Sequence, residues 1–457
     1  MRVWLLVVTL VLAGGASAPM AGAQSFTDAL IAAYRNSNLL EQNRAVLRAA
    51  DEDVALAVST LRPVVAYTAR TGWAKADVST PAGRATVEGL SASLTLSAEL
   101  TLFDFGRNQL GIEIARASVL ATRQALVDVE QQVLLAAVQA YVDVRLSQEV
   151  VILRQNNLRL ITEELRAAEA RFEVGENTRT DVAIAEARLA GSNAELATAE
   201  GRLLVARESY KAATGDYPGT LRELPTLPAL PRTLEEAQEV ARNTSPSIRQ
   251  AQQLVTVADL QLALAKAARL PTIGAGAALS RDELGLDTQS VGITMNQTLY
   301  AGGRLSALQR QAIAGKDRAR AALQQTAVLV MQNVGVSWAN LNVSFASIEA
   351  TDQQINAAQT AFDGVRQEAE VGARTTLDVL DAEQELLDAR NARLEAVAQR
   401  YIGVYLVLSS MGLLTVDHLQ LGIPTYDPEA YFNAVKNAPA HSVQGAKLDR
   451  ILKKIGN

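Results

Sequence analysis

The sequence predicts a mainly helical protein with a small amount of membrane-type β structure. Three observations support this fold class: a tandem duplication of the chain, two helical tracts of about 65 residues each, and segments in which apolar and polar residues alternate strictly. Helical rods of that length span on the order of 100 Å, which is more than the core of a globular domain requires. We therefore expect long antiparallel helical hairpins that continue into strands.

The duplication is visible when the chain is compared with itself. Residues 173–186 recur as residues 370–383 at an offset of 197, and the same offset relates Gly106 to Gly303. Upstream of these glycines the second half is 11 residues shorter than the first. A length change in one place, inside otherwise constant spacing, is what a surface loop tolerates.

The duplication gives a domain plan of four parts. Residues 1–23 read as a secretory signal, with an arginine, an apolar run and small residues before the cleavage site. The first repeat covers 24–225 and the second covers 226–422, each in the order helix, two strands, long helix, tip, helix. Residues 423–457 lose this pattern, and we expect a flexible periplasmic tail there.

Four segments are predicted to be strands: 64–79, 87–104, 271–281 and 289–300. The alternation is clearest between Leu90 and Leu102, where one face is apolar and the other is small and polar. Such strands are typical of a barrel with lipid outside and a wet lumen. Because four strands cannot close a barrel and open edges are not tolerated in lipid, several copies are expected to share one. Exposed loops are expected near Pro81-Ala82 and Leu284-Gly285.

The remaining elements are predicted to be helices. A helix is expected over residues 26–61, where Pro63 then stops it. The long tracts begin after Gly106 and Gly303, and their alanine, valine and leucine spacing suits antiparallel coiled-coil packing. Further on, each tract is broken by a tip glycine that is expected to adopt a positive φ angle.

Composition excludes several function classes. The net charge is −6, there is no cysteine, and there are only two histidines, far apart in the sequence. A disulfide, a lipid-anchoring cysteine, a nucleic-acid partner and a clustered metal site are therefore not expected. We expect no enzyme activity and no cofactor.

Together these features resemble the TolC family of outer-membrane efflux proteins. The tips at residues 174–182 and 371–382, the strand-to-helix turns at residues 102–107 and 299–304, and the duplication itself carry the resemblance. It implies a homotrimer with a 12-stranded β-barrel in the outer membrane and a helical tunnel in the periplasm. It also implies a passive duct for type I protein secretion or multidrug efflux, docked to a periplasmic adaptor (membrane fusion) protein and an inner-membrane ABC or RND transporter.

Two acids at the second tip are candidate pore residues. Asp378 and Asp381 lie three residues apart at the start of a helix, so their carboxylates point the same way. In a trimer they would form six acidic groups around one axis, and such rings attract cations. By resemblance, these acids line the periplasmic entrance. The alternative is that both acids simply favour a helix N-terminus. Asp378 has a repeat mate, Asp181, whereas the mate of Asp381 is Ile184.

The resemblance also implies a gate latch and a docking surface. Arg374 corresponds to an arginine of the family that latches the closed entrance. The residues to which that arginine is latched correspond to Thr180 and Asp181. The alternative is that Arg374 is a solvated loop arginine. The latch of the family can include a tyrosine where Ala369 stands here, so we expect a weaker latch or one made by other groups. The implied adaptor contacts are Gly175, Gly372, Val174, Val371 and Arg171.

A soluble periplasmic coiled-coil adaptor or scaffold without a pore is the alternative function. The alternating strands favour the channel, because an adaptor would carry a lipoyl-like or other barrel domain between its hairpin arms.

Overall fold

The computed structural model describes residues 24–81, 83–176, 178–282 and 286–438, together with 446, 447 and 450. The predicted signal at 1–23 and most of the chain beyond 438 lie outside the described residues. So do Ala82, Leu284 and Gly285 of the two predicted loops.

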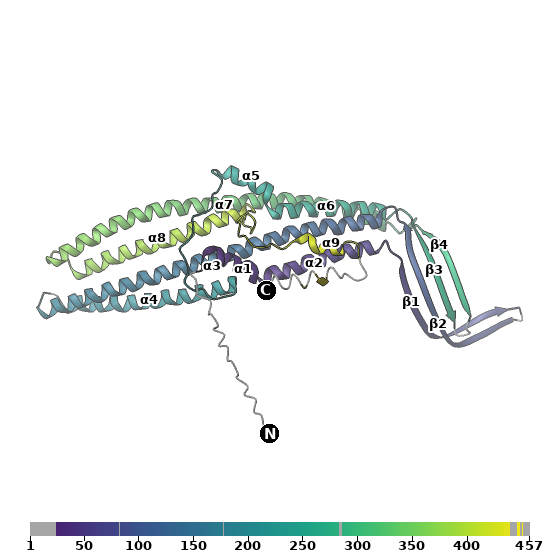
Figure 1. Ribbon diagram of the computed structural model, residues 1–457, viewed down its shortest axis with the longest axis horizontal. Coiled ribbons are helices and arrows are strands. Elements are labelled where there is room, and N and C mark those ends of the chain that lie inside the picture. The colour runs from purple at the N-terminus through teal and green to yellow at the C-terminus, as the bar shows by residue number, and fades with distance from the viewer. Residues whose placement is uncertain are drawn as a thin grey trace, which may run out of the picture. The chain divides into compact units, whose positions relative to one another are not determined.

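The order of elements repeats along the described chain (Figure 1). The first half contains α1 (Phe26–Asn36), α2 (Asn38–Ser59), β1 (Val64–Thr80), β2 (Gly83–Phe103), α3 (Arg107–Glu173) and α4 (Arg179–Thr214). The second half contains α5 (Leu234–Thr244), α6 (Pro246–Ala267), β3 (Thr272–Asp282), β4 (Asp287–Asn296), α7 (Arg304–Glu370) and α8 (Thr376–Ser410), followed by α9 (Pro428–Val435). Helix lengths recur as well, because α3 and α7 both have 67 residues and α2 and α6 both have 22.

The predicted helix over residues 26–61 is wrong in one respect, because it is two helices. Ser37 interrupts it with an extended backbone, and its hydroxyl accepts the backbone N–H of Leu40 at 3.2 Å. A serine at this position satisfies one of the N–H groups that a helix start leaves open. In the second half Ser245 separates α5 from α6 at the corresponding place, but its hydroxyl makes no cap hydrogen bond, and Pro246 occupies the first turn of α6.

The chain divides into two compact units that do not coincide with the two repeats. Unit 1 comprises Met1–Ala33, Ala137–Leu227 and Gln354–Ala398, and unit 2 comprises Tyr34–Ala136, Pro228–Gln353 and Gln399–Asn457. Each unit therefore combines segments from both halves of the duplication. Residues of one half depend on the other half for their packing.

Unit 1 is built from helical hairpins. In Figure 1, α3 runs beside α4, and α7 runs beside α8. Arg154 on α3 forms an ion pair with Glu195 on α4 at 2.6 Å, and Arg390 on α8 donates to Gln359 on α7 at 2.7 Å. Each of these contacts joins the two helices of a single hairpin, so it helps to fix the register within that hairpin.

The chain that enters and leaves unit 1 is tied to α3 by a buried tyrosine. The Tyr141 hydroxyl donates to the backbone carbonyl of Arg222 at 2.7 Å and to that of Gln24 at 3.2 Å. The ring of Phe26 packs edge-on against Tyr141, with centroids 5.3 Å apart. A buried tyrosine needs such partners for its hydroxyl. This contact joins the start of α1 to the segment after α4.

Unit 2 contains an antiparallel sheet in the order β1-β2-β3-β4. Its strand boundaries lie within a few residues of those that the alternation predicts. The pairing register places apolar residues beside apolar residues and polar residues beside polar residues across the sheet. On one face an apolar row runs through Val65, Ala98, Ala277 and Val291. On the opposite face a polar row runs through Thr68, Thr95, Ser280 and Thr288.

The turn from β2 into α3 is fixed by side-chain bonds. The Asp104 carboxylate accepts the backbone N–H of Gly106 at 3.0 Å and that of Asn108 at 2.7 Å. Arg107 then donates from Nε to the carbonyl of Ala267, at the end of α6, at 2.8 Å. The glycine-arginine turn therefore sets where the long helix begins and against which helix end it lies.

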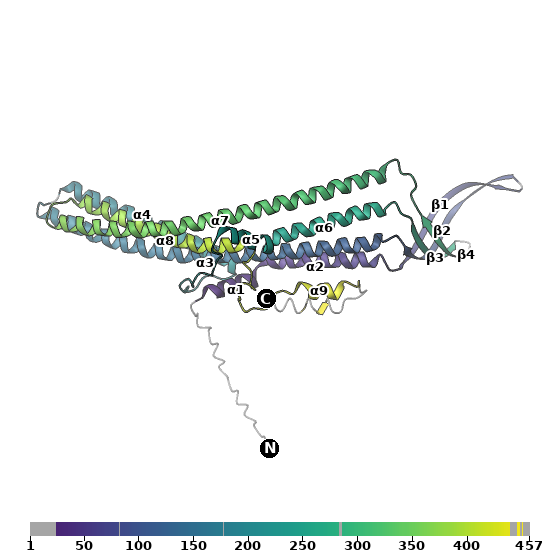
Figure 2. The ribbon, with the colours of Figure 1, turned by 90° about the horizontal axis from the view of Figure 1, so that it is seen from above.

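The structure differs from the expected flexible tail between residues 424 and 438. Helix α9 lies along α2 in both views (Figure 1, Figure 2). Phe432 and Tyr426 pack against a buried cluster formed by Leu47, Val54 and Val119. This short amphipathic segment covers an apolar surface of α2 and α3, which is the physical reason that it is folded.

Over the part of the chain that the structure describes, no helix is both long enough and apolar enough to cross a membrane.

Candidate functional site at the helical tips

The first tip reverses the chain through a glycine. At the end of α3 the backbone N–H of Gly175 donates to the carbonyl of Phe172 at 3.0 Å, and that of Glu176 donates to Arg171 at 2.9 Å. This pair of bonds is a Schellman motif, which requires a left-handed residue after the helix. Gly175 supplies that conformation with a φ of 83°.

The second tip is built in the same way. Gly372 has a φ of 76°, and its N–H donates to Ala369 at 3.1 Å, while Ala373 donates to Glu368 at 2.9 Å. The predicted positive φ is thus confirmed at both glycines. A Cβ at either position would meet no atom within 4 Å, so backbone conformation rather than space requires glycine there.

Each return helix begins with a capping box. Thr178 and Asp181 bond each other's backbone N–H groups at the start of α4. Thr375 and Asp378 do the same at the start of α8, with distances of 2.9 and 3.2 Å. The threonine and the aspartate thereby satisfy N–H groups that would otherwise lack partners.

The capping bonds also hold the two aspartates ionised. Backbone and side-chain hydrogen bonds from Thr375 lower the pKa of Asp378, and nearby Arg374 lowers it further. Hydrogen bonds from Thr178 lower the pKa of Asp181 in the same way. The helix-start alternative therefore accounts for the position of Asp378. A pore role for its charge remains a prediction.

Asp381 has a different partner from Asp378. Its carboxylate forms an ion pair with Arg188 on α4, in the other hairpin. The two side chains are 56 % and 39 % exposed, so the pair lies at the surface of the helices. The two predicted pore acids are therefore close in sequence but held in separate networks.

Arg374 does not contact its predicted latch partners within the described chain. Its Nε donates to Glu368 at 2.8 Å, across the tip turn, and this bond raises the arginine pKa. Asp181 is engaged in its capping box, and Thr180 is exposed beside it. A latch between Arg374 and these residues remains a prediction.

The predicted docking residues lie on the tip surface. Val174 is 71 % exposed and Val371 is 80 % exposed, although both are apolar. Arg171 is partly exposed on the last turn of α3. The structure brings these residues to the ends of the hairpins, where a partner can reach them.

A buried acid near the second tip was missed by the sequence analysis. Glu383 on α8 is only 5 % exposed, and both of its carboxylate oxygens lack a hydrogen-bond partner in the described chain. The pKa of Glu383 is raised to about 7, chiefly by burial and also by nearby Glu164, while Arg366 opposes the shift. Its repeat mate Glu186 is exposed, so the sequence carries no signal that separates the two.

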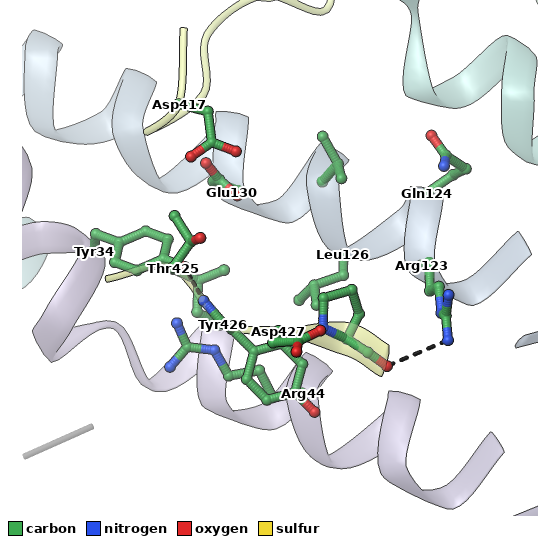
Figure 3. Close-up of a pocket in the computed structure, with 13 residues that line it drawn as sticks. Tyr34, Arg44, Arg123, Gln124, Leu126, Glu130, Asp417, Thr425, Tyr426 and Asp427 are labelled. Carbon is green, nitrogen blue, oxygen red and sulfur yellow. Dashed lines mark hydrogen bonds between the residues drawn. The ribbon is translucent and has the colours of Figure 1, made fainter. Parts of the chain in front are cut away.

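A second candidate site is a cavity of about 450 Å³ in unit 2 (Figure 3). It lies among α2, α3 and the chain before α9, and the Arg44 guanidinium sits over the rings of Tyr34 and Tyr426 at 5.2 and 5.4 Å. Glu130 accepts the backbone N–H of Val416 at 2.7 Å, and burial raises its pKa. Arg123 donates to the carbonyl of Pro428 at 3.3 Å.

The charged groups around this cavity are directed at the C-terminal segment itself. They include acids and arginines together, so the cavity favours no single ligand charge. In the segments with described coordinates, no group of three or more histidine, cysteine or acidic side chains could hold a metal ion. We interpret the cavity as an anchor for the C-terminal segment, and the tips remain the candidate functional site.

Comparison with known proteins identifies relatives that match most of the chain. The model of the outer membrane efflux protein family matches residues 30–216 and 238–410. The outer membrane efflux protein BepC of Brucella suis is 34 % identical over 421 residues, which is 91 % of each chain. The proteases secretion protein PrtF of Dickeya chrysanthemi is 27 % identical and covers 88 % of this chain and 90 % of its own.

Solved structures share the same fold. The outer membrane protein VceC from Vibrio cholerae superposes with a TM-score of 0.73 at 20 % identity, over 85 % of this chain and 96 % of its own. The CmeC outer membrane channel of Campylobacter jejuni gives a TM-score of 0.75 at 15 % identity, over 91 % and 90 % of the two chains.

Proposed function

This chain belongs to the outer membrane efflux protein family, and on that premise we propose that three copies of it form one exit channel, gated at the helical tips. The protein is an outer-membrane channel, and its helical hairpins form the periplasmic part. In the proposed assembly each copy contributes four strands to a 12-stranded barrel. The helices of the three copies enclose a tunnel through which cargo leaves the cell.

The sheet is the observation that carries this proposal. Val65 and Val291, at the two ends of one apolar row, are 66 % and 88 % exposed in the single chain. Among the described residues, β1 and β4 each pair on one side only. Apolar surface and open strand edges are both unfavourable in isolation. Further copies that continue the sheet would pair the edges and direct the apolar face to lipid.

Helix α7 supports the same assembly. Leu329, Val336 and Val343 recur every seven residues, and they are 46 %, 52 % and 63 % exposed. Apolar residues at this spacing form a seam that packs against another helix. In the proposed trimer, a helix of the neighbouring copy covers this seam.

The tips supply the gate and the docking surface in this proposal. Asp378 and Asp381 concentrate cations at the entrance, and Arg374 latches the closed state across copies. A periplasmic adaptor docks through Val174 and Val371, beside Arg171, and an inner-membrane ABC or RND transporter supplies the cargo. Two observations support this assignment: both valines are exposed, and the two tips have the same pattern of backbone hydrogen bonds.

We favour small molecules as the cargo of this channel. The relative with 34 % identity over nearly the whole chain is named as an efflux protein. Protein secretion is the second candidate, because a relative at 27 % identity is named for secretion of proteases. Deletion of the gene followed by susceptibility tests and analysis of secreted protein would distinguish the two cargo classes.

The mass of the detergent-extracted protein tests the shared assembly. We expect three times the mass of the mature chain, and loss of that species on heating. The variant Val336→Asp places a charge in the α7 seam and should shift the protein toward smaller species. A wild-type protein that is monomeric in mild detergent would contradict the proposal.

A further inference from the structure

The two hairpins of unit 1 touch through a small apolar cluster near their tips. Leu380 on α8 is 3 % exposed and packs with Ile161 and Ala168 on α3 and with Ala185 on α4. Ala168 and Ala185 are fully buried. One leucine from the second hairpin thus fills a site that the first hairpin provides.

The ion pair between Arg188 and Asp381 lies at the edge of this cluster. Asp381 directly follows Leu380, and Arg188 lies one helical turn beyond Ala185. The pair therefore joins α4 to α8 at the place where the apolar contact ends. It differs from the pair of Arg154 with Glu195, which stays within one hairpin.

The duplication shows that this pair is not a general feature of the helix surface. At the offset of 197 residues, the mate of Arg188 is Glu385 and the mate of Asp381 is Ile184. Glu385 accepts a hydrogen bond from Gln354 in its own hairpin, at 2.9 Å. Neither partner of the ion pair recurs at the equivalent position, so the repeat-related positions cannot form the same pair.

We propose that Arg188 is a gate residue, which fastens the two hairpins through Asp381 and neutralises that acid while they are together. This proposal rests on the proposed function, because it assigns a role at the same entrance. When the hairpins separate, the pair breaks and the Asp381 carboxylate is released. Asp378 remains charged in both states, because its capping partner Thr375 is neutral. The entrance would then carry more unpaired negative charge when open than when closed.

The strength of the pair suits a switch. Both side chains are more than a third exposed, and ion pairs of this kind change an equilibrium by only about two- to fivefold. The contact can therefore be broken by docking of a partner. Burial of Leu380 also holds the hairpins together, and this apolar contact depends on neither charge.

Single-channel recording in planar bilayers tests the proposal with four variants. Arg188→Ala and Asp381→Ala should each raise the open probability about two- to fivefold, because each removes the pair. The ion selectivities of these two variants should shift away from that of the wild type in opposite directions. Cation preference should increase in Arg188→Ala, which removes a positive charge from the entrance, and decrease in Asp381→Ala, which removes a negative charge. The exchanged variant Arg188→Asp/Asp381→Arg should restore the wild-type open probability, and the double alanine variant should open no more than either single variant.

Arg154→Ala is the matched control, because it removes an ion pair of similar geometry within one hairpin. It should leave the open probability and the selectivity unchanged. The proposal is overturned if Arg188→Ala channels open and select ions as the wild type does, or if the exchanged variant opens as often as the single variants. Either result would leave the trimeric channel intact. A wild-type protein that forms no channel at all would overturn the proposed function as well.

Discussion

Thr375 and Asp378 hold each other at the start of α8. The aspartate accepts both the backbone N–H and the hydroxyl of the threonine, at 2.9 and 2.8 Å. The threonine hydroxyl in turn accepts the N–H of Asp378 at 3.2 Å. An acid that was predicted for the pore is therefore also a structural part of its own helix.

The two roles of Asp378 can be separated by substituting its partner. Thr375→Ala removes the cap and keeps the carboxylate, so it should lower thermal stability, by about 1 kcal/mol for a typical cap. The pKa of Asp378 should rise only part of the way toward its usual range, because the hydroxyl bond is lost while the backbone N–H of residue 375, which lowers the pKa most, can still donate. Conductance at neutral pH should keep its cation preference. Thr178→Ala, at the equivalent cap, is the control, and a loss of selectivity in Thr375→Ala alone would show that the cap positions the charge.

Glu383 should make unit 1 more stable in mild acid than in mild base. Its folded pKa of about 7 lies above the unperturbed value of 4.5, so the packed helices favour the protonated form. The stabilisation is complete below pH 4.5 and is lost as the pH rises through 7, by at most about 3 kcal/mol. Glu383→Gln should abolish this dependence and raise stability at pH 8. Urea unfolding between pH 4.5 and 8 measures both effects.

The exposed repeat mate provides the control for that experiment. Glu186→Gln should leave the pH dependence of unfolding as it is in the wild type. A wild-type protein whose stability is flat over this pH range would show that Glu383 is not buried in the assembled protein.

Arg123 should hold the C-terminal segment in place. It pairs with Glu429 at 3.1 Å, and its guanidinium lies over the ring of Phe432 at 5.4 Å. Arg123→Ala removes both contacts, so limited proteolysis should cut residues 424–438 faster. Glu429→Gln removes only the exposed pair and should have a smaller effect. If both variants are cleaved at the same rate as the wild type, the apolar contacts alone hold the C-terminal segment.

The face of the sheet decides where a charge is tolerated. Val291→Arg should reduce the amount of protein in the outer membrane, because a cation on a lipid face costs about 2–4 kcal/mol near the bilayer midplane. Thr288→Arg, three residues away on the opposite face, should assemble normally. Fractionation of the two variants measures the difference. Equal assembly would contradict the assignment of the apolar row to lipid.

Local patterns in the sequence predict most of this fold. Strict alternation located the strands, and the duplication with its glycines located the long hairpins and their tips. Ser37 was not recognised as a break because apolar spacing continues on both sides of it. Helix α9 was missed because it has only eight residues and gains its order from a surface on α2 and α3.

The candidate site was predicted less completely, for a related reason. The partner of Asp381 lies 193 residues away in the sequence. Their contact depends on how two hairpins are aligned, and helix periodicity within either hairpin carries no information on that alignment. Burial of Glu383 and exposure of Glu186 depend on the same alignment.

Ion selectivity of the purified protein in planar bilayers tests the central claim most directly. We predict discrete channel openings with a cation-selective reversal potential and block by divalent cations, since acids crowded at one constriction concentrate cations. Both properties should be weakened in Asp378→Ala/Asp381→Ala, with the trimer intact. An absence of channel openings in the wild type would contradict the account of an exit channel, and unchanged selectivity and block in the double variant would contradict the assignment of its entrance.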